Sequence, residues 1–327
     1  MLAAWYERQG AAAEVLTVGE MPVPEPGPHE VRVRVRFSGV NPGDTKKRQD
    51  VFGYGMPYPR VIPHSDGAGD IDAVGAGVPA ARVGERVWIW NGQWRRPFGT
   101  AAEVITVPAE QAVPLPTNVT MAAGACLGIP AYTAYQAVAL AEVVQGSTVL
   151  VSGGAGAVAH YAIQLAKKRG AIVITTVSSA AKGEIARQAG ADYVIDYRRE
   201  PVGERVKAIT ENLGVQAMIE LDLAINAKLL PEVLAPNAVV AIYGSSSQEV
   251  SIPFQLLLQN SIALKFFLVY EMPRPMRERA TAEISRLLAR GELIHNVAQT
   301  FALEDIAAAH EAVECGRAMG NIVVRLR

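Results

Sequence analysis

Cysteine is scarce in this chain of 327 residues, which contains only Cys126 and Cys315. Two cysteines can build neither a disulfide framework nor a four-cysteine zinc cluster, and their scarcity fits a reducing compartment. Net charge is also lacking, because 31 Lys and Arg residues face 32 Asp and Glu residues. A net charge of −1 supplies no global field that would attract nucleic acid or an anionic membrane.

Long apolar runs are missing as well, since Gly, Pro or a charged residue interrupts each of them before membrane-spanning length. Residues 1–8 contain no basic region followed by an apolar core, so we expect no secretory signal. Together these absences predict a cytoplasmic protein that binds neither membrane nor nucleic acid.

What is present is an ordinary globular composition, with 50% hydrophobic and 19% charged residues. A chain of 327 residues is long for one core and suits two domains. Residues 1–125 are predicted to form short strands and turns. Residues 30–37 alternate with period two, which predicts a half-buried strand. Their arginines, Arg32, Arg34 and Arg36, fit the solvent face of an antiparallel strand better than a nucleic-acid site, because no aromatic platform accompanies them.

A different pattern follows, in which short apolar strands alternate with helical segments. We expect strands at 147–151, 171–177, 194–196, 217–220 and 239–243, and helices at 158–169 and 180–188. Such alternation predicts a parallel, doubly wound sheet covered by helices. The chain then returns to helices and ends in a strand at 321–325, which we expect to complete the first domain. The predicted domains are therefore 1–125 and 126–270, with 271–327 returning to the first.

A glycine-rich turn joins the first of these strands to its helix. Gly154, Gly156 and Ala159 match the pattern G-x-G-x-x-A, which is typical of dinucleotide-binding turns. Glycine permits the tight turn, and the helix N-terminus favours an anion. A purely structural turn is the alternative. We expect a pyrophosphate to be bound by residues of this turn: Gly154, Ala155, Gly156, Ala157 and Val158.

The end of the second strand indicates which dinucleotide is used. An NAD site usually places a carboxylate there, whereas this chain continues with Ser178, Ser179 and Lys182. Two hydroxyls and an ammonium suit the 2′-phosphate of NADPH, which a carboxylate would repel. The alternative is that Ser178 caps the next helix and Lys182 is merely solvated.

Several further motifs occur in order along the chain: Ser38-Gly39-Val40-Asn41-Pro42-Gly43-Asp44, Pro63-His64-Ser65-Asp66-Gly67-Ala68-Gly69, and the segments 83–87, 99–104, 127–135, 188–192 and 243–244. With them the sequence resembles, over nearly its whole length, the quinone oxidoreductase (zeta-crystallin-like) branch of the medium-chain dehydrogenases/reductases. The resemblance implies an α/β protein with a GroES-like β-barrel domain, a Rossmann domain and an active site in the cleft between them.

Zinc is not expected, although alcohol dehydrogenases of the same superfamily bind it. Their cysteine ligand corresponds to Asn41, and their histidine ligand aligns most simply with Ser65. Neither Asn nor Ser replaces a thiolate or an imidazole well. Without this Lewis acid, the remaining chemistry is hydride transfer to an acceptor that is already electron-poor, such as a quinone or an enone.

The resemblance also implies residue roles. Asn41, Asp44 and Thr133 would line the site around the nicotinamide and the substrate. Alternatively, residues 41–44 form an ordinary turn and Thr133 is a buried helical residue. Positions that border NADPH in relatives correspond here to four further residues: Tyr197, Gly244, Phe267 and Val269. Residues 267–269 could equally be part of a core strand.

A segment rich in tryptophan and arginine, residues 88–96, is less familiar. It is either a solvated loop with packed indoles or a site where Arg95 and Arg96 receive a substrate carboxylate.

The sequence leaves three functional hypotheses open. The first is an NADPH-dependent reductase of quinones or small enones, and the second is a reductase of 2-alkenals or substituted (halo)acrylates. The third is a non-catalytic NADPH-binding protein, crystallin-like or RNA-binding. The apolar segment 262–270 is predicted to be an edge strand that pairs across a two-fold axis in a homodimer.

Overall fold

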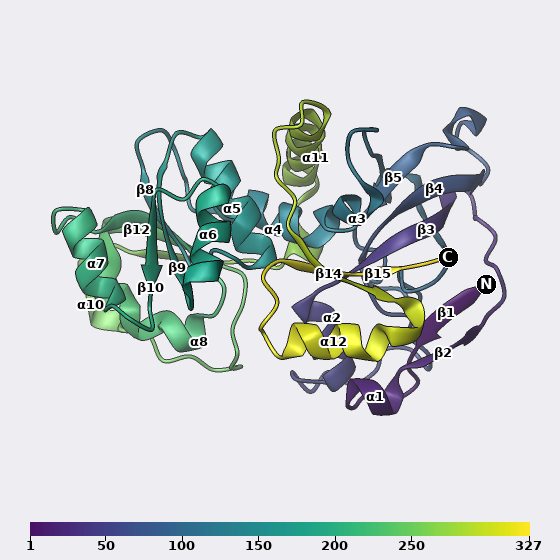
Figure 1. Ribbon diagram of the computed structural model, residues 1–327, viewed down its shortest axis with the longest axis horizontal. Helices are drawn as coiled ribbons and strands as arrows, with labels where there is room; N and C mark the ends of the chain where they lie inside the picture. The colour runs from purple at the N-terminus through teal and green to yellow at the C-terminus, as the bar shows by residue number, and fades with distance from the viewer. The chain divides into compact units, whose positions relative to one another are not determined.

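The computed structural model describes residues 1–327 and contains two compact units. The first unit comprises Met1–Ile129 and Thr281–Arg327, and the second comprises Pro130–Ala280. The second unit is thus inserted into the sequence of the first, as the teal and green segments of the ribbon show (Figure 1). The units divide at 129/130 and 280/281, a few residues after the predicted boundaries at 125/126 and 270/271.

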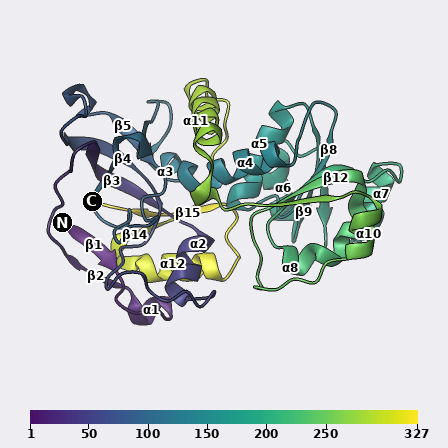
Figure 2. The same cartoon turned by 180° about the vertical axis from the view of Figure 1, so that it is seen from behind.

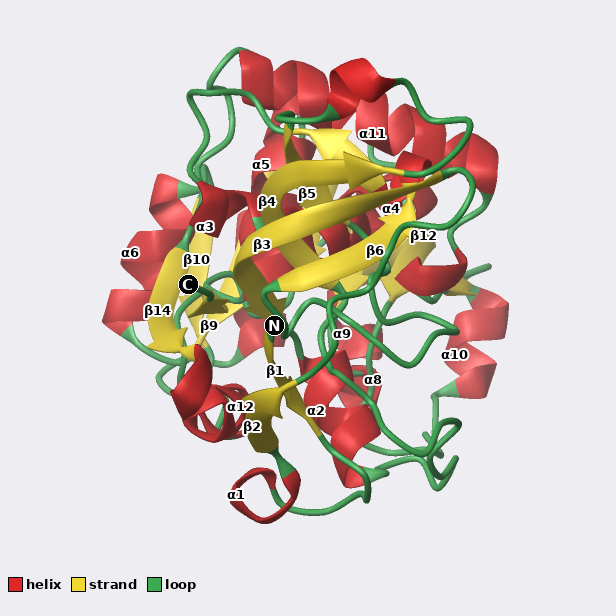
Figure 3. Cartoon of the chain, turned by 90° about the vertical axis from the view of Figure 1, so that its right-hand side faces the viewer, coloured by secondary structure: helices red, strands yellow, loops and turns green.

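The first unit is organised around a seven-stranded sheet of order β14-β15-β3-β4-β5-β7, in which β6 also pairs with β3. The final strand β15 runs antiparallel to β3, with Val324 opposite Ser38, so the end of the chain joins the sheet of the first unit. Figure 3 shows β3 lying between β4 and β6. The strands are β3 (Glu30–Val40), β4 (Asp66–Val74), β5 (Arg86–Ile89), β6 (Val104–Pro108), β7 (Ala112–Pro114), β14 (Val297–Ala302) and β15 (Asn321–Arg325), with β1 (Leu2–Trp5) and β2 (Thr17–Glu20) paired separately.

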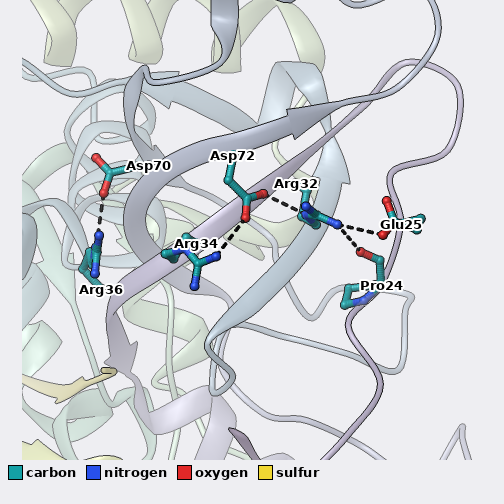
Figure 4. Close-up of polar contacts among 7 residues, drawn as sticks. All are labelled: Pro24, Glu25, Arg32, Arg34, Arg36, Asp70 and Asp72. Carbon is teal, nitrogen blue, oxygen red and sulfur yellow. Dashed lines mark hydrogen bonds and ion pairs between the residues drawn. The ribbon is translucent and has the colours of Figure 1, made fainter. Parts of the chain in front are cut away.

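Strand β3 has the two faces that its alternation predicts. Val31, Val33 and Val35 are fully buried in the core of the unit. On the other face Arg32 and Arg34 pair with Asp72, and Arg36 pairs with Asp70 (Figure 4). Arg32 also contacts Glu25, at 2.9 Å. The arginine stripe is therefore compensated by carboxylates of β4 and of the preceding connector, which supports the interpretation as a solvent face.

Helices complete the first unit. They are α1 (Ala12–Val15), α2 (Pro42–Gln49), α3 (Met121–Gly124) and α12 (Ile306–Glu314), while α11 (Arg274–Ala289) leads the chain back from the second unit. Helix α12 lies beside α1 and α2, as Figures 1 and 2 both show. It buries Ile306, Ala309 and His310, so the C-terminal part of the chain packs on the N-terminal part.

The second unit is a six-stranded sheet of order β10-β9-β8-β11-β12-β13, and all neighbouring strands run parallel. The order proceeds in opposite directions from β8 and from β11, which confirms the predicted doubly wound sheet. Its strands are β8 (Thr148–Val151), β9 (Ile172–Val177), β10 (Tyr193–Asp196), β11 (Val215–Glu220), β12 (Leu234–Ile242) and β13 (Ala263–Phe266).

The helices of the second unit are α4 (Tyr132–Leu140), α5 (Ala157–Lys168), α6 (Ala180–Gln188), α7 (Val202–Ile209), α8 (Leu223–Asn226), α9 (Leu230–Val233) and α10 (Phe254–Gln259). Helix α5 buries Ala159, Ala162 and Ile163, spaced by three and one residues, which is the apolar face that its sequence predicts. The strands contribute fully buried Leu150, Ile174 and other apolar side chains to the core. No helix of the chain combines the length and the apolar character needed to cross a membrane.

Candidate functional site

The predicted cofactor residues gather at one edge of the parallel sheet. The glycine turn follows β8, Ser178 follows β9, and Tyr197 follows β10. Gly244 lies two residues after the end of β12, and Phe267 directly follows β13. Because the strands are parallel, their carboxyl ends lie along the same edge of the sheet. In sheets of this type, ligands bind at that edge, at the point where the strand order reverses. In this sheet the order reverses between β8 and β11.

The turn after Val151 has the tight geometry that its glycines allow. Gly153 adopts φ 72°, a left-handed conformation that suits glycine. The N–H of Gly154 donates to the carbonyl of Thr176 at 3.0 Å, and that of Gly156 donates to Gly153 at 2.8 Å. A Cβ added to Gly154 would overlap the hydroxyl of Thr175, so the close approach of turn and strand requires glycine here.

Helix α5 starts directly after this turn. The N–H of His160 donates to the carbonyl of Gly156 at 3.0 Å and closes the first helical turn. The amides of Ala157, Val158 and Ala159 precede it, at the end of the helix where no carbonyl lies one turn earlier. Their donors and the positive end of the helix dipole make this terminus suitable for a phosphate group.

A buried carboxyl group supports the turn from the neighbouring strand. Glu220 ends β11, is fully buried and accepts the hydroxyl of Ser152 at 2.6 Å. It also accepts the side-chain amide of Asn226 at 2.9 Å and the backbone N–H of Asp222 at 2.5 Å. Burial raises the pKa of Glu220 above its usual value. Sequence reasoning missed this residue, although a glutamate directly after the apolar residues 217–219 was a signal for it.

The end of β9 leads into α6 as expected, with one correction. Ser179, rather than Ser178, is the N-cap, and its hydroxyl accepts the backbone N–H of Lys182 at 3.3 Å. Ser178 stands between the strand and the cap. Both serines and Lys182 are half-buried. The hydroxyl of Ser178 is therefore not used to cap the helix.

The remaining predicted cofactor residues lie in loops at the same edge. Tyr197 is 53% exposed, and its N–H donates to the carbonyl of Val177 at 3.1 Å. A Cβ on Gly244 would overlap the carbonyl of Leu221, so only glycine fits there. Phe267 donates its N–H to Ile242 at 3.2 Å. The alternative that residues 267–269 form a core strand is wrong, because β13 ends at Phe266 and Val269 begins a short 3₁₀ turn.

In the first unit the candidate catalytic residues Asn41 and Asp44 lie at the start of α2. Residues 41–44 are therefore a helix N-terminus rather than a turn, with Pro42 in the first turn as its fixed φ favours. The backbone N–H of Asn41 donates to the carboxylate of Asp44 at 2.9 Å. Its side-chain amide donates to the carboxylate of Asp66 at 2.8 Å. Thr133, the third candidate, is buried in α4 of the second unit.

Charged groups surround Asn41. Burial raises the pKa of Asp44 and raises that of Asp66 well above its usual value. One oxygen of each carboxyl group has no hydrogen-bond partner. Lys47 donates its ammonium to Gln93 at 2.9 Å, and burial lowers its pKa despite the nearby Asp44 and Asp66. Sequence reasoning missed this lysine, because its partner lies 46 residues further along the chain.

The segment 88–96 is not simply a solvated loop. Trp88 belongs to β5 and is fully buried, and Trp90 is nearly so. The guanidinium group of Arg95 lies 6.0 Å from the ring of Trp94, and Arg95 itself is exposed. Arg96 is half-buried, and its guanidinium nitrogen lies 3.7 Å from the carboxylate of Glu30. The indoles are therefore packed, as one of the two interpretations held, while the guanidinium groups lie nearer the surface.

Comparisons with known proteins agree with this arrangement. Residues 27–117 match the family model described as alcohol dehydrogenase GroES-like domain, and residues 157–286 match that of zinc-binding dehydrogenase. A quinone oxidoreductase of Pseudomonas aeruginosa is 31% identical over 95% of this chain and 95% of its own length. The chain belongs to the quinone oxidoreductase branch of the medium-chain dehydrogenases/reductases. It is therefore an oxidoreductase with a GroES-like and a Rossmann domain.

Other members differ in the substrate or coenzyme that they are named for. A 2-haloacrylate reductase of a Burkholderia species is 29% identical and covers 93% of both chains. The structure of Escherichia coli quinone oxidoreductase complexed with NADPH has a TM-score of 0.87, with 27% identity and 100% coverage of both chains. An NAD-dependent alcohol dehydrogenase has a TM-score of 0.90, with 29% identity and full coverage of both chains.

Zinc, which the name of one family model mentions, does not fit the residues of this chain. No three His, Cys, Asp or Glu side chains come together as a metal site. Asn41 engages Asp66 through its amide, and Ser65 offers a single hydroxyl. The ring nitrogens of His64 both have protein partners, Ser38 and His310. The donor set therefore lacks the thiolate and imidazole ligands that zinc prefers.

His160, one turn beyond the phosphate turn, should make the stability of the second unit depend on pH. Burial lowers its pKa to about 4, from 6.5. Below pH 6.5 the His160 ring takes up a proton in the unfolded chain but not in the folded chain. The contribution of His160 to the free energy of unfolding is therefore complete above pH 6.5 and is lost as the pH falls towards 4. From pH 7 to 4.5 the free energy of unfolding should fall by about 2–3 kcal/mol more in the wild type than in His160→Gln. Urea denaturation at both pH values measures the difference, and other titrating groups cancel because both proteins contain them. Parallel pH profiles would contradict the prediction.

Proposed function

We propose that this protein is an NADPH-dependent reductase that delivers hydride to quinones or to small α,β-unsaturated carbonyl compounds. The single observation that carries the proposal is the turn after β8, whose tight backbone ends in the N-terminus of α5 at the point where the strand order reverses. Relatives that carry the names quinone oxidoreductase and 2-haloacrylate reductase, and a neighbour complexed with NADPH, support it.

The second unit would hold the coenzyme with a defined set of groups. The backbone amides of Ala155, Ala157 and Val158 would bind the pyrophosphate, with Gly154 and Gly156 allowing its close approach. Ser178, Ser179 and Lys182 would bind the 2′-phosphate. Tyr197, Gly244, Phe267 and Val269 would border the rest of the molecule. When bound, NADPH supplies the hydride for the reduction.

Three side chains are candidates for acting on the substrate. Asn41, Asp44 and Thr133 are our candidates for groups that contact it, by resemblance and because all three are buried polar side chains. Asn41 is held by Asp66, so its amide has a fixed orientation from which the second N–H can donate. A donor of this kind stabilises the oxygen that becomes negatively charged as hydride reaches the acceptor.

Oxidation of NADPH in the presence of a panel of quinones, enones, 2-alkenals and acrylates tests the proposal. We expect turnover with at least one quinone or enone, and transfer of deuterium from NADPH labelled at the transferred position to the product. Binding of NADPH without turnover of any acceptor would favour the non-catalytic hypothesis instead.

Lys182 should distinguish the two coenzymes. Lys182→Ala should weaken NADPH binding by about 1.5–3 kcal/mol, the range for a charged hydrogen bond, because its ammonium contacts only the 2′-phosphate. NADH binding should remain nearly unchanged. Calorimetric titration with both coenzymes measures this, and Lys207→Ala on α7 is a control with the same loss of charge. An equal loss for NADPH and NADH would show that Lys182 does not recognise the additional phosphate.

The second candidate substrate class, substituted acrylates, is favoured by the two arginines near Trp94 and by the haloacrylate reductase relative. Arg95→Ala and Arg96→Ala should each raise the KM for 2-haloacrylate several-fold, about 1 kcal/mol or more, because a carboxylate loses its guanidinium partner. The KM for an uncharged quinone should stay the same. Steady-state kinetics with both acceptors measures the KM values, with Arg60→Ala, the loss of a half-buried arginine elsewhere in the first unit, as a control. If the KM for the acrylate is unchanged, its carboxylate binds elsewhere.

We further propose a homodimer that forms through β13. This strand is an edge of the parallel sheet, and nearby apolar side chains are exposed: Phe254 68%, Leu258 66%, Phe266 66% and Leu268 50%. An apolar edge of this kind is usually covered. Light scattering should give the mass of a dimer, and Phe266→Lys should give a monomer. Tyr193→Lys on the opposite edge strand β10 should leave the dimer intact. A monomeric wild type would exclude the assembly.

A reducing, cytoplasmic location is also proposed, because both cysteines are free and the coenzyme is kept reduced there. Cell fractionation tests it.

A further inference from the structure

A continuous row of buried polar side chains crosses the first unit. Thr100, Ser38, His64, His310 and Arg48 are all fully buried. They come from separate parts of the chain, since Ser38 lies on β3, Arg48 on α2 and His310 on α12. The last two helices are neighbours (Figures 1 and 2). Side chains so deeply buried must satisfy one another's hydrogen bonds.

The contacts connect these five side chains end to end. Arg48 Nε lies 3.4 Å from His310 Nδ1, and His310 Nε2 lies 2.9 Å from His64 Nε2. His64 Nδ1 lies 2.8 Å from the Ser38 hydroxyl, which lies 2.7 Å from the Thr100 hydroxyl. Thr100 in turn donates to the backbone carbonyl of Asp66. The two imidazole rings meet edge to edge, because their centroids are 5.1 Å apart while the facing nitrogens are in hydrogen-bond contact.

Only one arrangement of protons satisfies the whole row. A carbonyl cannot donate, so Thr100 gives its only hydrogen to Asp66 and must accept from Ser38. Ser38 therefore accepts from His64, whose proton must be on Nδ1. At the other end a guanidinium group can only donate, so His310 Nδ1 accepts and its proton is on Nε2. The facing nitrogens then form His310 Nε2–H to His64 Nε2. The direction of the hydrogen bonds that follows from the Asp66 carbonyl is therefore the same as the direction that follows from the Arg48 guanidinium group.

Both rings are neutral in this arrangement. A second proton on either ring would place an N–H group against another donor. In agreement with this, burial lowers the pKa of His64 well below its usual value and that of His310 to about 3. The row is not a path for protons between solvent and the site. Its outer end is Arg48, which pairs with Glu314 and does not give up its proton, and its inner end is a carbonyl group.

The inner end leads directly to the candidate catalytic amide. Asp66, whose carbonyl receives the last hydrogen bond, holds the side chain of Asn41 with its carboxylate. The backbone at His64 has φ 76°, a left-handed conformation that is unfavourable for a residue with a side chain. Its carbonyl accepts the N–H of Thr100 at 3.0 Å, which ties the two loops together again. A residue kept in an unfavourable conformation by surrounding hydrogen bonds is a common feature of functional sites.

We propose that His64 and His310 are positioning residues of the reductase, which as neutral imidazoles of opposite tautomers carry a one-way hydrogen-bond chain from Arg48 to the carbonyl of Asp66 and thereby fix the Asp66–Asn41 pair. The role in catalysis rests on the proposed function, whereas the chain itself does not. The orientation of the Asn41 amide thus depends on the contact between His64 and His310, which are 246 residues apart in sequence.

Nitrogen NMR of the imidazole rings tests the chain without any assay of activity. In wild-type protein labelled with ¹⁵N-histidine at pH 7, His64 should carry its proton on Nδ1 and His310 on Nε2. Two Nε2–H tautomers, or a charged ring at either position, would overturn the proposal. The measurement uses the intact protein and needs no variant that has to fold.

Thr100 provides a matched pair of variants for the positioning role. Thr100→Val keeps the shape of the side chain but removes the link from Ser38 to Asp66, whereas Thr100→Ser keeps the hydroxyl. In Thr100→Val we expect kcat with a quinone to fall about tenfold, as for a small misplacement at a site, with the KM for NADPH unchanged. The side-chain amide resonance of Asn41 should shift. In Thr100→Ser both should stay close to wild type.

A second variant, His64→Gly, removes the ring while glycine retains the left-handed backbone, and it should lower kcat in the same way. If kcat and the Asn41 resonance are unaffected in Thr100→Val and in His64→Gly, the positioning role is wrong. If the wild type oxidises no NADPH with any acceptor, the proposed function is wrong, and the tautomers and the Asn41 resonance still decide whether the chain holds Asn41.

Discussion

The parallel direction of all six strands in the second unit is the constraint on which the functional account depends. It brings the loops after β8, β9, β10, β12 and β13 to one edge, although these loops are spread over more than a hundred residues. At that edge the backbone of Gly154 approaches β9 so closely that no side chain fits. The N-terminus of α5 can then offer its amides to a phosphate, and Glu220 supports the turn from β11 through Ser152.

The first unit solves a different problem, which is to keep polar groups in place inside a β-rich core. Asn41, Asp44 and Asp66 lie where burial disfavours charge, and two carboxyl oxygens have no partner there. A buried polar group without a partner costs on the order of 1–3 kcal/mol, so such groups persist where the surrounding structure holds them. The row from Arg48 to Thr100 supplies that support, and each member is fully satisfied in only one order of protons. A network of this kind specifies one conformation more strictly than apolar packing does.

Local patterns were sufficient to predict much of this from the sequence. The glycine turn, the helix 180–188 and the final strand depend on neighbouring residues, and the structure has α6 at Ala180–Gln188 and β15 at Asn321–Arg325. Local rules were less reliable for ends and caps. Ser179 replaced Ser178 as the cap, and residues 41–44 began a helix, because an N-cap and a turn use the same residue types. The segment 262–270 is apolar except for Lys265, yet β13 comprises only Ala263–Phe266.

What sequence reasoning could not reach is contact between distant residues. His64 seemed an isolated histidine, and nothing near it in sequence indicates His310. Lys47 follows another lysine and gives no sign of the contact with Gln93, and Glu220 reveals its role only when β8 and β11 are adjacent. Each of these residues acts through a contact with a residue distant in sequence, and the fold determines which distant residues come into contact.

A structure of the complex with NADPH is the decisive test of coenzyme binding at the turn after β8. We expect the pyrophosphate within hydrogen-bond distance of the amides of Ala157 and Val158, and the 2′-phosphate beside Ser178 and Lys182. A coenzyme bound at another edge of the sheet, or with its 2′-phosphate turned away from Lys182 into solvent, would contradict it.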